Sequence, residues 1–277
     1  IIDEYFSKKI IAQPNLSWGG YEKIGRKLYG KEIVHENENY VYVIEKENKN
    51  INLLFFQIPK PPELILSVYS SYGLSKVKIN RLSFPKQGEV KYEYSFLKLI
   101  EIENKLILFI KALDTKTDAV KLLAQEITVN GTQQGKFFEI DQGVASKSPG
   151  LFKRTKFTNF SIRLSPDQHR IGIVKFNATQ DTDFLKVGYK LLDANLKAEW
   201  SGSVVLPFEN QYLNLTAYEL GSNGDLFLLG KAWKLERKIG ATGNSKTKVS
   251  KQGKGAPNYT YKCLIFSTEK KTLRQVD

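Results

Sequence analysis

Dense apolar segments recur along the chain, and each follows a short polar turn. Four runs, rich in aliphatic and aromatic residues, have this arrangement: Tyr40–Ile44, Leu106–Ile110, Ile171–Phe176 and Leu226–Leu229. The turns that precede them are 65, 65 and 54 residues apart, counted between Asn39, Asn104, His169 and Asn223. Self-similarity at a roughly fixed period indicates one structural unit used several times.

Each apolar run predicts an inner strand, because continuous apolarity without alternation is typical of a strand covered on both faces. A more amphipathic strand is predicted before each run, at Gly30–His35, Phe96–Ile102, Phe160–Leu164 and Leu215–Leu220. An outer strand is predicted after each run, at Ile51–Gln57, Val120–Ile127, Phe184–Leu192 and Tyr259–Phe266. Two further strands, Leu64–Tyr69 and Val77–Leu82, are expected between the first and second units.

The third unit shows the pattern in full between Ser161 and Trp200. Ile162 and Leu164 alternate with polar residues, the period of a half-buried strand. The segment Ser165–Gln168 has the composition of a turn, with a proline that presets the backbone angle. A second turn at 193–195 leads into a short last strand, so the unit is predicted to be a four-stranded antiparallel meander.

A four-stranded unit that cannot bury its faces alone is the signature of a repeat protein. The sequence therefore predicts an all-β fold, a β-propeller or incomplete propeller of four-stranded antiparallel blades. The alternative is a large β-sandwich. Residues 1–277 are expected to form one propeller-like domain. Four units are few for a closed ring, which is compatible with a fragment of a longer protein.

The segment from Lys231 to Pro257 interrupts the fourth unit and is predicted to be a mobile basic loop. It contains eight basic residues and one acid, Glu236, among glycines and serines. Such a composition buries too little apolar surface to order itself. If this loop contacts an anionic partner, the residues expected to do so are Lys234, Arg237, Lys238, Lys246, Lys248, Lys251 and Lys254. The alternative is a plain solvated linker.

The formal net charge of +13 gives only limited information about the binding partners of the protein. A basic balance favours acidic partners, but most lysines are dispersed along predicted strands, and nucleic-acid binding is disfavoured. No apolar run reaches the roughly 18 residues of a membrane helix. No signal peptide pattern is visible at the start of the chain. We expect the partner to be another envelope protein or an acidic surface.

Residues with catalytic or metal-binding chemistry are few. His35 and His169 have no metal-ligand spacing, and the single cysteine, Cys263, lies in a predicted strand as a small hydrophobe. The carboxylate pairs Asp114/Asp118 and Asp181/Asp183 lie in polar turns. Neither a phosphate-binding loop nor a nucleophile elbow occurs, since Ser201–Ser203 has no base that can be named. The sequence assigns no catalytic residue, cofactor or metal.

Two segments, Leu191–Trp200 and Asn223–Gly230, resemble the end and the start of blades in uncharacterised β-propeller-like envelope proteins of the Bacteroidetes type. The first carries the pattern Asp-x-Asn-Leu-x-x-x-Trp. The second carries Asn-Gly followed by apolar residues and glycine. The resemblance covers residues 96–277 and departs from the family pattern in the N-terminal third. It implies a secreted or periplasmic scaffold and no catalytic residues.

Taken together, these observations predict a non-enzymatic binding or scaffold module that acts outside the cytoplasm, in the periplasm or after secretion. The alternative is a hydrolase acting on glycans, whose carboxylates converge only in the folded protein. A site lined by aromatic residues and lysines would favour binding. Two converging carboxylates with shifted pKa values would favour the enzyme.

Overall fold

The computed structural model describes residues 28–47, 50–53, 56–59, 63–85, 92–114, 116–147, 155–176, 184–209, 213–233, 235–239, 245–249 and 258–276. Within these ranges the regular elements are all β-strands, which confirms the predicted all-β class. In the same ranges, no helix has the length and apolarity needed to cross a membrane. The chain divides into two compact units, residues 1–82 and 83–277, which are described separately.

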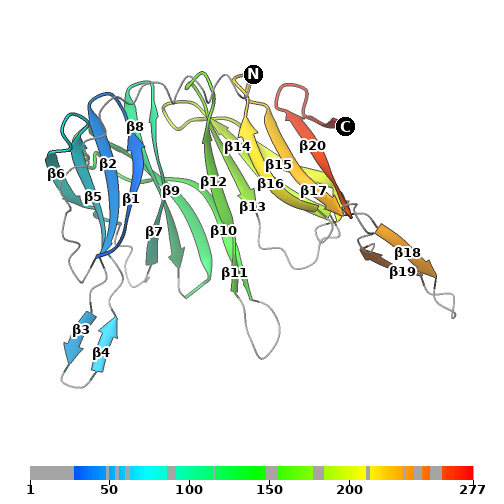
Figure 1. The fold of residues 1–277 in the computed structure, drawn as a ribbon, viewed down its shortest axis with the longest axis horizontal. Coiled ribbons are helices and arrows are strands. Elements are labelled where there is room, and N and C mark those ends of the chain that lie inside the picture. Colours follow the sequence, from blue (N-terminus) through cyan, green and yellow to red (C-terminus); the bar gives the residue numbers. More distant parts are fainter. Residues whose placement is uncertain are drawn as a thin grey trace. The chain divides into compact units, whose positions relative to one another are not determined.

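The described part of the first unit contains one four-stranded antiparallel sheet, sheet 1 (Figure 1). Its strands, in spatial order, are β1 (Leu28–Glu36), β2 (Tyr40–Glu47), β5 (Glu63–Ser70) and β6 (Lys76–Arg81). One face buries Tyr42, Leu66 and Val68. A separate hairpin is inserted between the second and third strands, formed by β3 (Asn50–Leu53) and β4 (Phe56–Pro59).

The prediction of an outer strand at Ile51–Gln57 is wrong, because this segment folds back on itself as the β3–β4 hairpin. The third strand of sheet 1 is β5, which pairs with β2 from Tyr40 opposite Ser70 to Glu47 opposite Glu63. The physical reason is burial. Residues 64–68 of β5 are buried without interruption, as a central strand requires. Predicted strands 64–69 and 77–82 therefore complete the first unit.

The described part of the second unit contains three further antiparallel sheets of four or five strands. Sheet 2 has the order β7 (Tyr92–Ile102), β8 (Lys105–Asp114), β9 (Ala119–Ile127), β10 (Phe138–Lys147) and β11 (Thr155–Phe157). Sheet 3 consists of β12 (Asn159–Leu164), β13 (Ile171–Phe176), β14 (Phe184–Leu192) and β15 (Ala198–Glu209). Sheet 4 consists of β16 (Leu213–Leu220), β17 (Leu226–Trp233), β20 (Tyr259–Ser267) and β21 (Thr272–Val276).

The four apolar runs occupy equivalent places, as the repeat predicts. They lie in β2, β8, β13 and β17, and each of these is the second strand of its meander, paired with the first and third strands. The antiparallel four-stranded meander is the blade type of a propeller and is equally compatible with packed sandwich sheets. Repetition of this unit is therefore a property of the structure.

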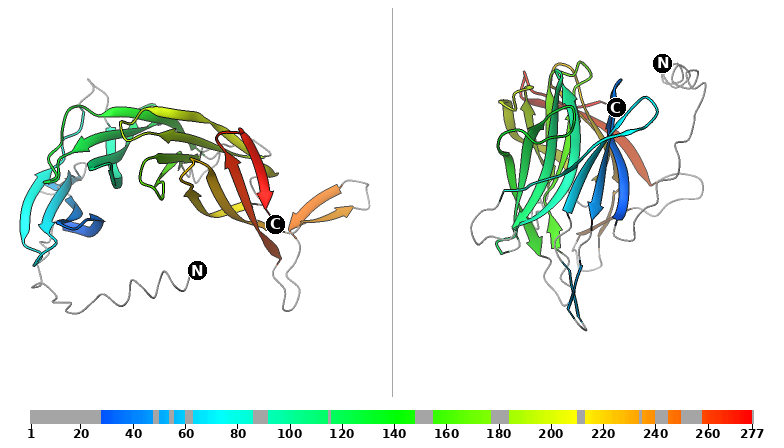
Figure 2. Two further views of the ribbon diagram at one scale, coloured as in Figure 1. Left: turned by 90° about the horizontal axis from the view of Figure 1, so that it is seen from above. Right: turned by 90° about the vertical axis from the view of Figure 1, so that its left-hand side faces the viewer.

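The sheets of the second unit pack face to face in chain order, from green through yellow to red in the left panel of Figure 2. Sheets 2 and 3 share a core in which Phe109 of β8 packs with Ile171 and Ile173 of β13. Sheets 3 and 4 share a second core, in which Val174 and Tyr189 pack with Leu228. Sheet 3 is thus covered on both faces, which explains its unbroken apolar strand.

Gly224 in the turn between β16 and β17 illustrates how close the sheets approach. Its φ is +84°, in the left-handed region where a side chain is strained. A Cβ atom there would lie 2.5 Å from Cδ2 of Leu191 in sheet 3. The Tyr189 hydroxyl of sheet 3 donates a hydrogen bond of 2.8 Å to the Gly224 carbonyl. This turn is therefore part of the contact between sheets 3 and 4.

The predicted basic loop emerges between β17 and β20, which are neighbours in sheet 4. Two of its segments form a hairpin, β18 (Leu235–Ile239) and β19 (Ser245–Val249), with Leu235 opposite Val249. The rest of residues 234–257 lies outside the described residues, as do the side chains of this hairpin. The mobility of the loop stays a prediction.

Candidate functional site

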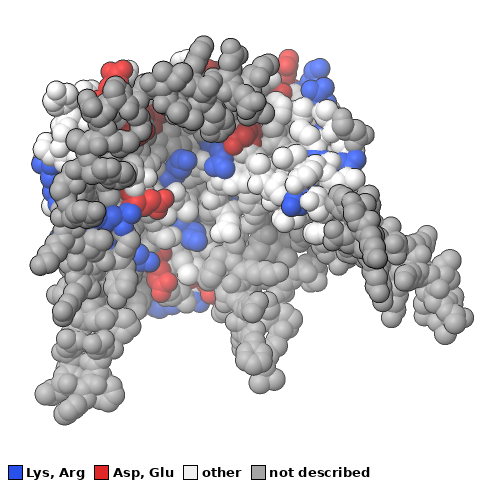
Figure 3. Space-filling view, viewed as in Figure 1, with Lys and Arg blue, Asp and Glu red and all other residues white. Residues whose placement is uncertain are grey.

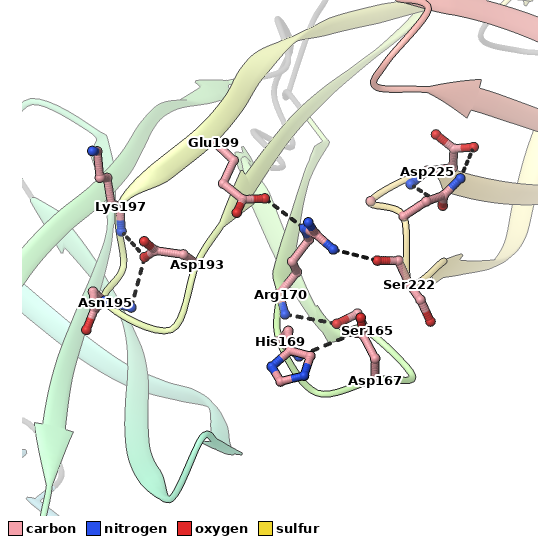
Figure 4. Close-up of polar contacts among 12 residues, drawn as sticks. Ser165, Asp167, His169, Arg170, Asp193, Asn195, Lys197, Glu199, Ser222 and Asp225 are labelled. Atoms are coloured by element: carbon pink, nitrogen blue, oxygen red, sulfur yellow. Dashed lines mark hydrogen bonds and ion pairs between the residues drawn. The ribbon is translucent and has the colours of Figure 1, made fainter.

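The polar turns that the sequence singles out link neighbouring sheets of the second unit (Figure 4). Arg170, after the turn between β12 and β13, donates hydrogen bonds to Glu199 at 2.8 Å and to the Ser222 carbonyl at 2.7 Å. His169 lies 3.0 Å from Glu103, and Lys105 donates to Asn195 at 2.6 Å. Exposed contacts of this kind contribute about 0–1 kcal/mol each. These residues position turns and have no catalytic arrangement.

The carboxylates considered in the sequence also have structural roles where they are described. Asp114 accepts hydrogen bonds from the Thr117 hydroxyl at 2.6 Å and the Lys116 amide at 2.8 Å. The pKa of Asp114 is lowered by these bonds, chiefly by that from Thr117. Asp181 and Asp183 lie outside the described residues. Within the described part of the chain no cluster of His, Cys, Asp or Glu suits a metal ion.

The predicted basic contact residues are only partly placed. Arg237 and Lys238 lie on β18, and Lys246 and Lys248 lie on β19, with Lys238 opposite Lys246. The remaining three, Lys234, Lys251 and Lys254, lie outside the described residues. Among the described side chains visible in Figure 3, basic and acidic groups are interspersed. On the described surface in this view there is therefore no continuous basic patch that the predicted basic contact residues could extend.

A cavity on sheet 2 brings together groups that the sequence analysis did not select. Its volume is about 550 Å³, within the usual range of ligand pockets. It lies on the face of sheet 2 opposite the core shared with sheet 3. Its lining residues include Phe84, Tyr92, Tyr94, Ala112, Lys121, Gln125, Gln133, Phe137 and Glu139.

One side of the cavity is an aromatic wall. Phe84 stacks on Tyr94 with ring centroids 4.5 Å apart and an interplanar angle of 14°. Tyr92 and Phe137 extend this wall, 6.0 Å from Tyr94 and 6.2 Å from Phe84 respectively. The Tyr94 hydroxyl donates to the Pro85 carbonyl at 2.6 Å, and the pKa of Tyr94 is raised mainly by burial. The stacking and the hydroxyl bond together hold the Tyr94 ring in place.

A pair of glutamine amides fixes the loops around the cavity. Gln125 of β9 is buried and donates to the Gly135 carbonyl at 2.9 Å. Its own oxygen accepts a hydrogen bond from Gln133 at 2.6 Å. Gln133 also donates to the Ser83 carbonyl at 2.9 Å and accepts from the Ser83 amide at 2.6 Å. The amides therefore clamp the segment that carries Phe84 onto the sheet.

The opposite edge of the cavity is charged. Lys121 of β9 and Glu139 of β10 form an ion pair of 2.7 Å, and the pKa of Lys121 is raised chiefly by its hydrogen bond to Glu139. Ala112 of β8 lies between this pair and Tyr94, because Ala112 is opposite both Tyr94 and Lys121 in the sheet. Its small side chain leaves the space that larger neighbours would fill.

A signal for this site was present in the sequence. Tyr92 and Tyr94 are two residues apart on β7, and Lys121, Leu123 and Gln125 follow the same period on β9. Residues two apart on a strand share a face. The contribution of Phe84 and of residues 133–137 had no such signal, because these loops reach the sheet only through tertiary contacts.

Comparisons with known proteins give little further information. No protein family and no curated protein matches the sequence. A solved structure of a mannose phosphorylase from Leishmania mexicana, in complex with phosphate ion, aligns with a TM-score of 0.39 and 9% identity. The alignment covers 89% of this chain and 66% of that one. A likeness at this score carries no information about the chemistry of this chain.

Proposed function

We infer that this protein is a non-enzymatic binding module whose ligand occupies the aromatic cavity of sheet 2. The observation that carries the proposal is the cavity itself, with an aromatic wall on one side and amides and an ion pair on the others. Cavities lined by apolar rings and a few fixed polar groups are the usual form of a ligand site.

The chemistry of the lining fits a sugar ring. A pyranose has an apolar face of C–H groups that can lie against Tyr92 or Phe137, and a rim of hydroxyl groups. Lys121 and Glu139 provide a donor and an acceptor for such hydroxyls. The volume of about 550 Å³ is of the size that holds one or two sugar rings.

The geometry supports binding over hydrolysis. A glycoside hydrolase uses two carboxylates about 5–10 Å apart. Among the lining residues of the cavity, all of them described, Glu139 is the one carboxylate, and it is paired with Lys121. An acid held in an ion pair on a half-exposed edge lacks the apolar surroundings that prepare a general acid.

We further propose that the module acts outside the cytoplasm, as a scaffold of the Bacteroidetes envelope type. The support is the resemblance of segments 191–200 and 223–230 to blades of that family. A partner in this setting is another envelope protein or an acidic surface, contacted through the basic residues of segment 231–257.

Substitutions that fill the cavity or remove part of its aromatic wall are expected to weaken sugar binding. Ala112→Phe occupies the space between Tyr94 and Lys121, and Tyr92→Ala removes part of the aromatic wall. Each change is expected to weaken binding at least about tenfold, or about 1.4 kcal/mol. The measurement is ligand-observed NMR against a panel of mono- and disaccharides, followed by calorimetry on the best ligand.

Tyr72→Ala is the matched control, because Tyr72 is an aromatic residue with an exposed fraction of 93% in the first unit. It is expected to bind as the parent does. If no saccharide of the panel binds the parent protein, or if both cavity variants bind as tightly as Tyr72→Ala, the proposed function is wrong.

Deleting residues 240–255 is expected to leave the fold intact and to weaken binding to anionic surfaces. The deletion removes β19, which pairs with β18 in a separate two-stranded sheet. The melting temperature should change by no more than about 2 °C. Binding of the parent to heparin or to anionic vesicles should fall steeply with salt, since exposed charges are screened beyond about 10 Å at 0.1 M.

The matched control for this deletion replaces Lys246, Lys248, Lys251 and Lys254 with glutamine and keeps the loop length. It should weaken binding as much as the deletion does. A large fall in melting temperature would show that the loop is packed structure. Unchanged heparin binding would show that it is a plain linker.

A further inference from the structure

The floor of the sheet 2 cavity is apolar. Ala112 of β8 and Leu123 of β9 form it, and both side chains are buried. Tyr94 lies opposite Ala112 in the sheet, and Gln125 follows Leu123 by two residues on the same face of β9. A ligand group that lies on this floor leaves water, so any polar atom that it carries there needs a partner from the lining.

The two glutamine amides beside this floor have already used their hydrogen-bond donors. Gln125 donates to the Gln134 carbonyl at 3.2 Å and to the Gly135 carbonyl at 2.9 Å. Gln133 donates to the oxygen of Gln125 at 2.6 Å and to the Ser83 carbonyl at 2.9 Å. A side-chain amide has two N–H donors. Neither amide therefore has a donor left for a ligand oxygen.

The hydroxyl of Tyr94 is used in the same way, since it donates to the Pro85 carbonyl at 2.6 Å. A sugar oxygen placed between Tyr94 and the two glutamines would find acceptors but no donor among these three side chains. It would lose its hydrogen bonds to water without replacing them, which weakens binding. This part of the cavity therefore suits an apolar group better than a ring that carries hydroxyls on every side.

The capacity to bond ligand hydroxyls lies instead at the charged edge. The ion pair uses one ammonium hydrogen of Lys121 and one carboxylate oxygen of Glu139. An ammonium group has three hydrogens and a carboxylate has two oxygens, so both groups can contact a ligand while they stay paired. The side chains of Lys121 and Glu139 are 24% and 42% exposed. Lys136, which is exposed, adds a second ammonium group to the lining.

We propose that the ligand of this cavity is an amphipathic glycoside. Its sugar contacts Lys121 and Glu139 at the charged edge, and an apolar group joined to the sugar lies on Ala112 and Leu123 beside the aromatic wall. This inference rests on the proposed function, because it takes a sugar as the polar part of the ligand. It narrows that function, since a free sugar leaves the apolar floor without a matching group.

The experiment compares three glycosides of one sugar, with the same anomeric configuration and with methyl, phenyl or hexyl as the second group. The sugar is the monosaccharide of the panel that binds best, and the affinities are measured by calorimetry. The phenyl or the hexyl glycoside is expected to bind at least about tenfold tighter than the methyl glycoside, because more apolar surface leaves water. A preference for phenyl indicates an aryl group, and a preference for hexyl indicates the alkyl chain of a glycolipid.

The outcomes separate this inference from the proposed function. Equal affinities of the three glycosides overturn the inference and leave the proposed sugar site standing. If none of the three binds, the proposed function is wrong and the inference fails with it. Phenol and hexanol serve as probes without a sugar. If either binds as tightly as its glycoside, the sugar is not recognised, which also contradicts both.

Two variants test where each half of the ligand lies, and the quantity compared is the ratio of the affinities for the apolar and the methyl glycoside. Phe84→Ala removes a ring of the aromatic wall, which stacks on Tyr94, so the ratio is expected to fall toward one. Glu139→Gln weakens the contact with the sugar, so all three glycosides should bind more weakly by a similar factor. A ratio that falls in Glu139→Gln and stays in Phe84→Ala overturns the proposal.

Phe138→Ala is the matched control. Phe138 lies opposite Ala124, whose side chain belongs to the core shared with sheet 3, so Phe138 is on the other face of sheet 2 from the cavity. The ratio of affinities should equal that of the parent, and its loss in this variant would overturn the proposal. If Phe84→Ala does not melt cooperatively, Phe137→Ala replaces it, because Phe137 belongs to the same wall.

Discussion

Replacing Phe109 with alanine is expected to lower the free energy of unfolding of the second unit by about 3–5 kcal/mol. Phe109 of β8 is fully buried and packs in the core that joins sheets 2 and 3. The truncation removes apolar contacts and leaves a cavity, because β-strands held by neighbours on both sides relax little. Urea unfolding and a decrease in melting temperature of roughly 6–15 °C would measure it.

Phe138→Ala is the control for this truncation. Phe138 is the same residue type on β10 of the same sheet, but its exposed fraction is 60%. Its loss should change the stability by no more than about 0.5 kcal/mol. Equal effects of the two substitutions would contradict the assignment of Phe109 to the shared core.

Replacing Tyr189 with phenylalanine is expected to cost about 1–3 kcal/mol at neutral pH, because the Gly224 carbonyl loses its hydrogen-bond donor inside a core. The substitution should also change how the free energy of unfolding depends on pH above about pH 10. Burial, and secondarily the charge of Asp225, raises the pKa of Tyr189 far above its ordinary value of 10.0.

The direction of the pH effect follows from this raised pKa. The folded state keeps the phenol neutral, whereas the unfolded chain ionises it above about pH 10. Its contribution to stability is therefore complete below pH 10 and is lost as the pH rises beyond that value. The measurement is urea unfolding at several pH values between neutrality and the alkaline range.

Tyr72→Phe serves as the reference, since the ring of Tyr72 is 93% exposed. The stability of Tyr189→Phe should fall less steeply above pH 10 than that of Tyr72→Phe. Parallel alkaline slopes in the two variants would show that Tyr189 does not titrate differently in the folded and unfolded states.

The sequence by itself determined the repeat. Runs such as Leu106–Ile110 and Ile171–Phe176 contain too few polar residues for a strand with one solvent-exposed face. Their position as inner strands, paired on both sides, was therefore predictable. The turns that precede them were equally visible, because positive φ at Asn104 and Gly224 suits the residues found there. The apolar pattern of a strand and the residue types of a turn depend only on residues that are consecutive in the sequence. Both can therefore be recognised without the fold.

The sequence did not show which segment forms the third strand of sheet 1, and only the folded structure identified it. Ile51–Gln57 has the apolar content of an outer strand, but it pairs with itself as a hairpin, and β5 takes the place beside β2. Strand pairing depends on which of two apolar segments is better buried by its neighbours. The sequence of one segment alone therefore does not show which of the two segments will pair with β2.

The cavity was decided by tertiary structure. Tyr94, Gln125 and Gln133 lie on separate elements, and the clamp of Gln133 on Ser83 joins positions 50 residues apart. The different exposure of equivalent strand positions has the same origin, since Leu229 of β17 and Val174 of β13 are similarly apolar but are 38% and 1% exposed. The sequence pattern specifies which side chains are apolar, whereas the packing of the sheets decides which of these side chains are buried.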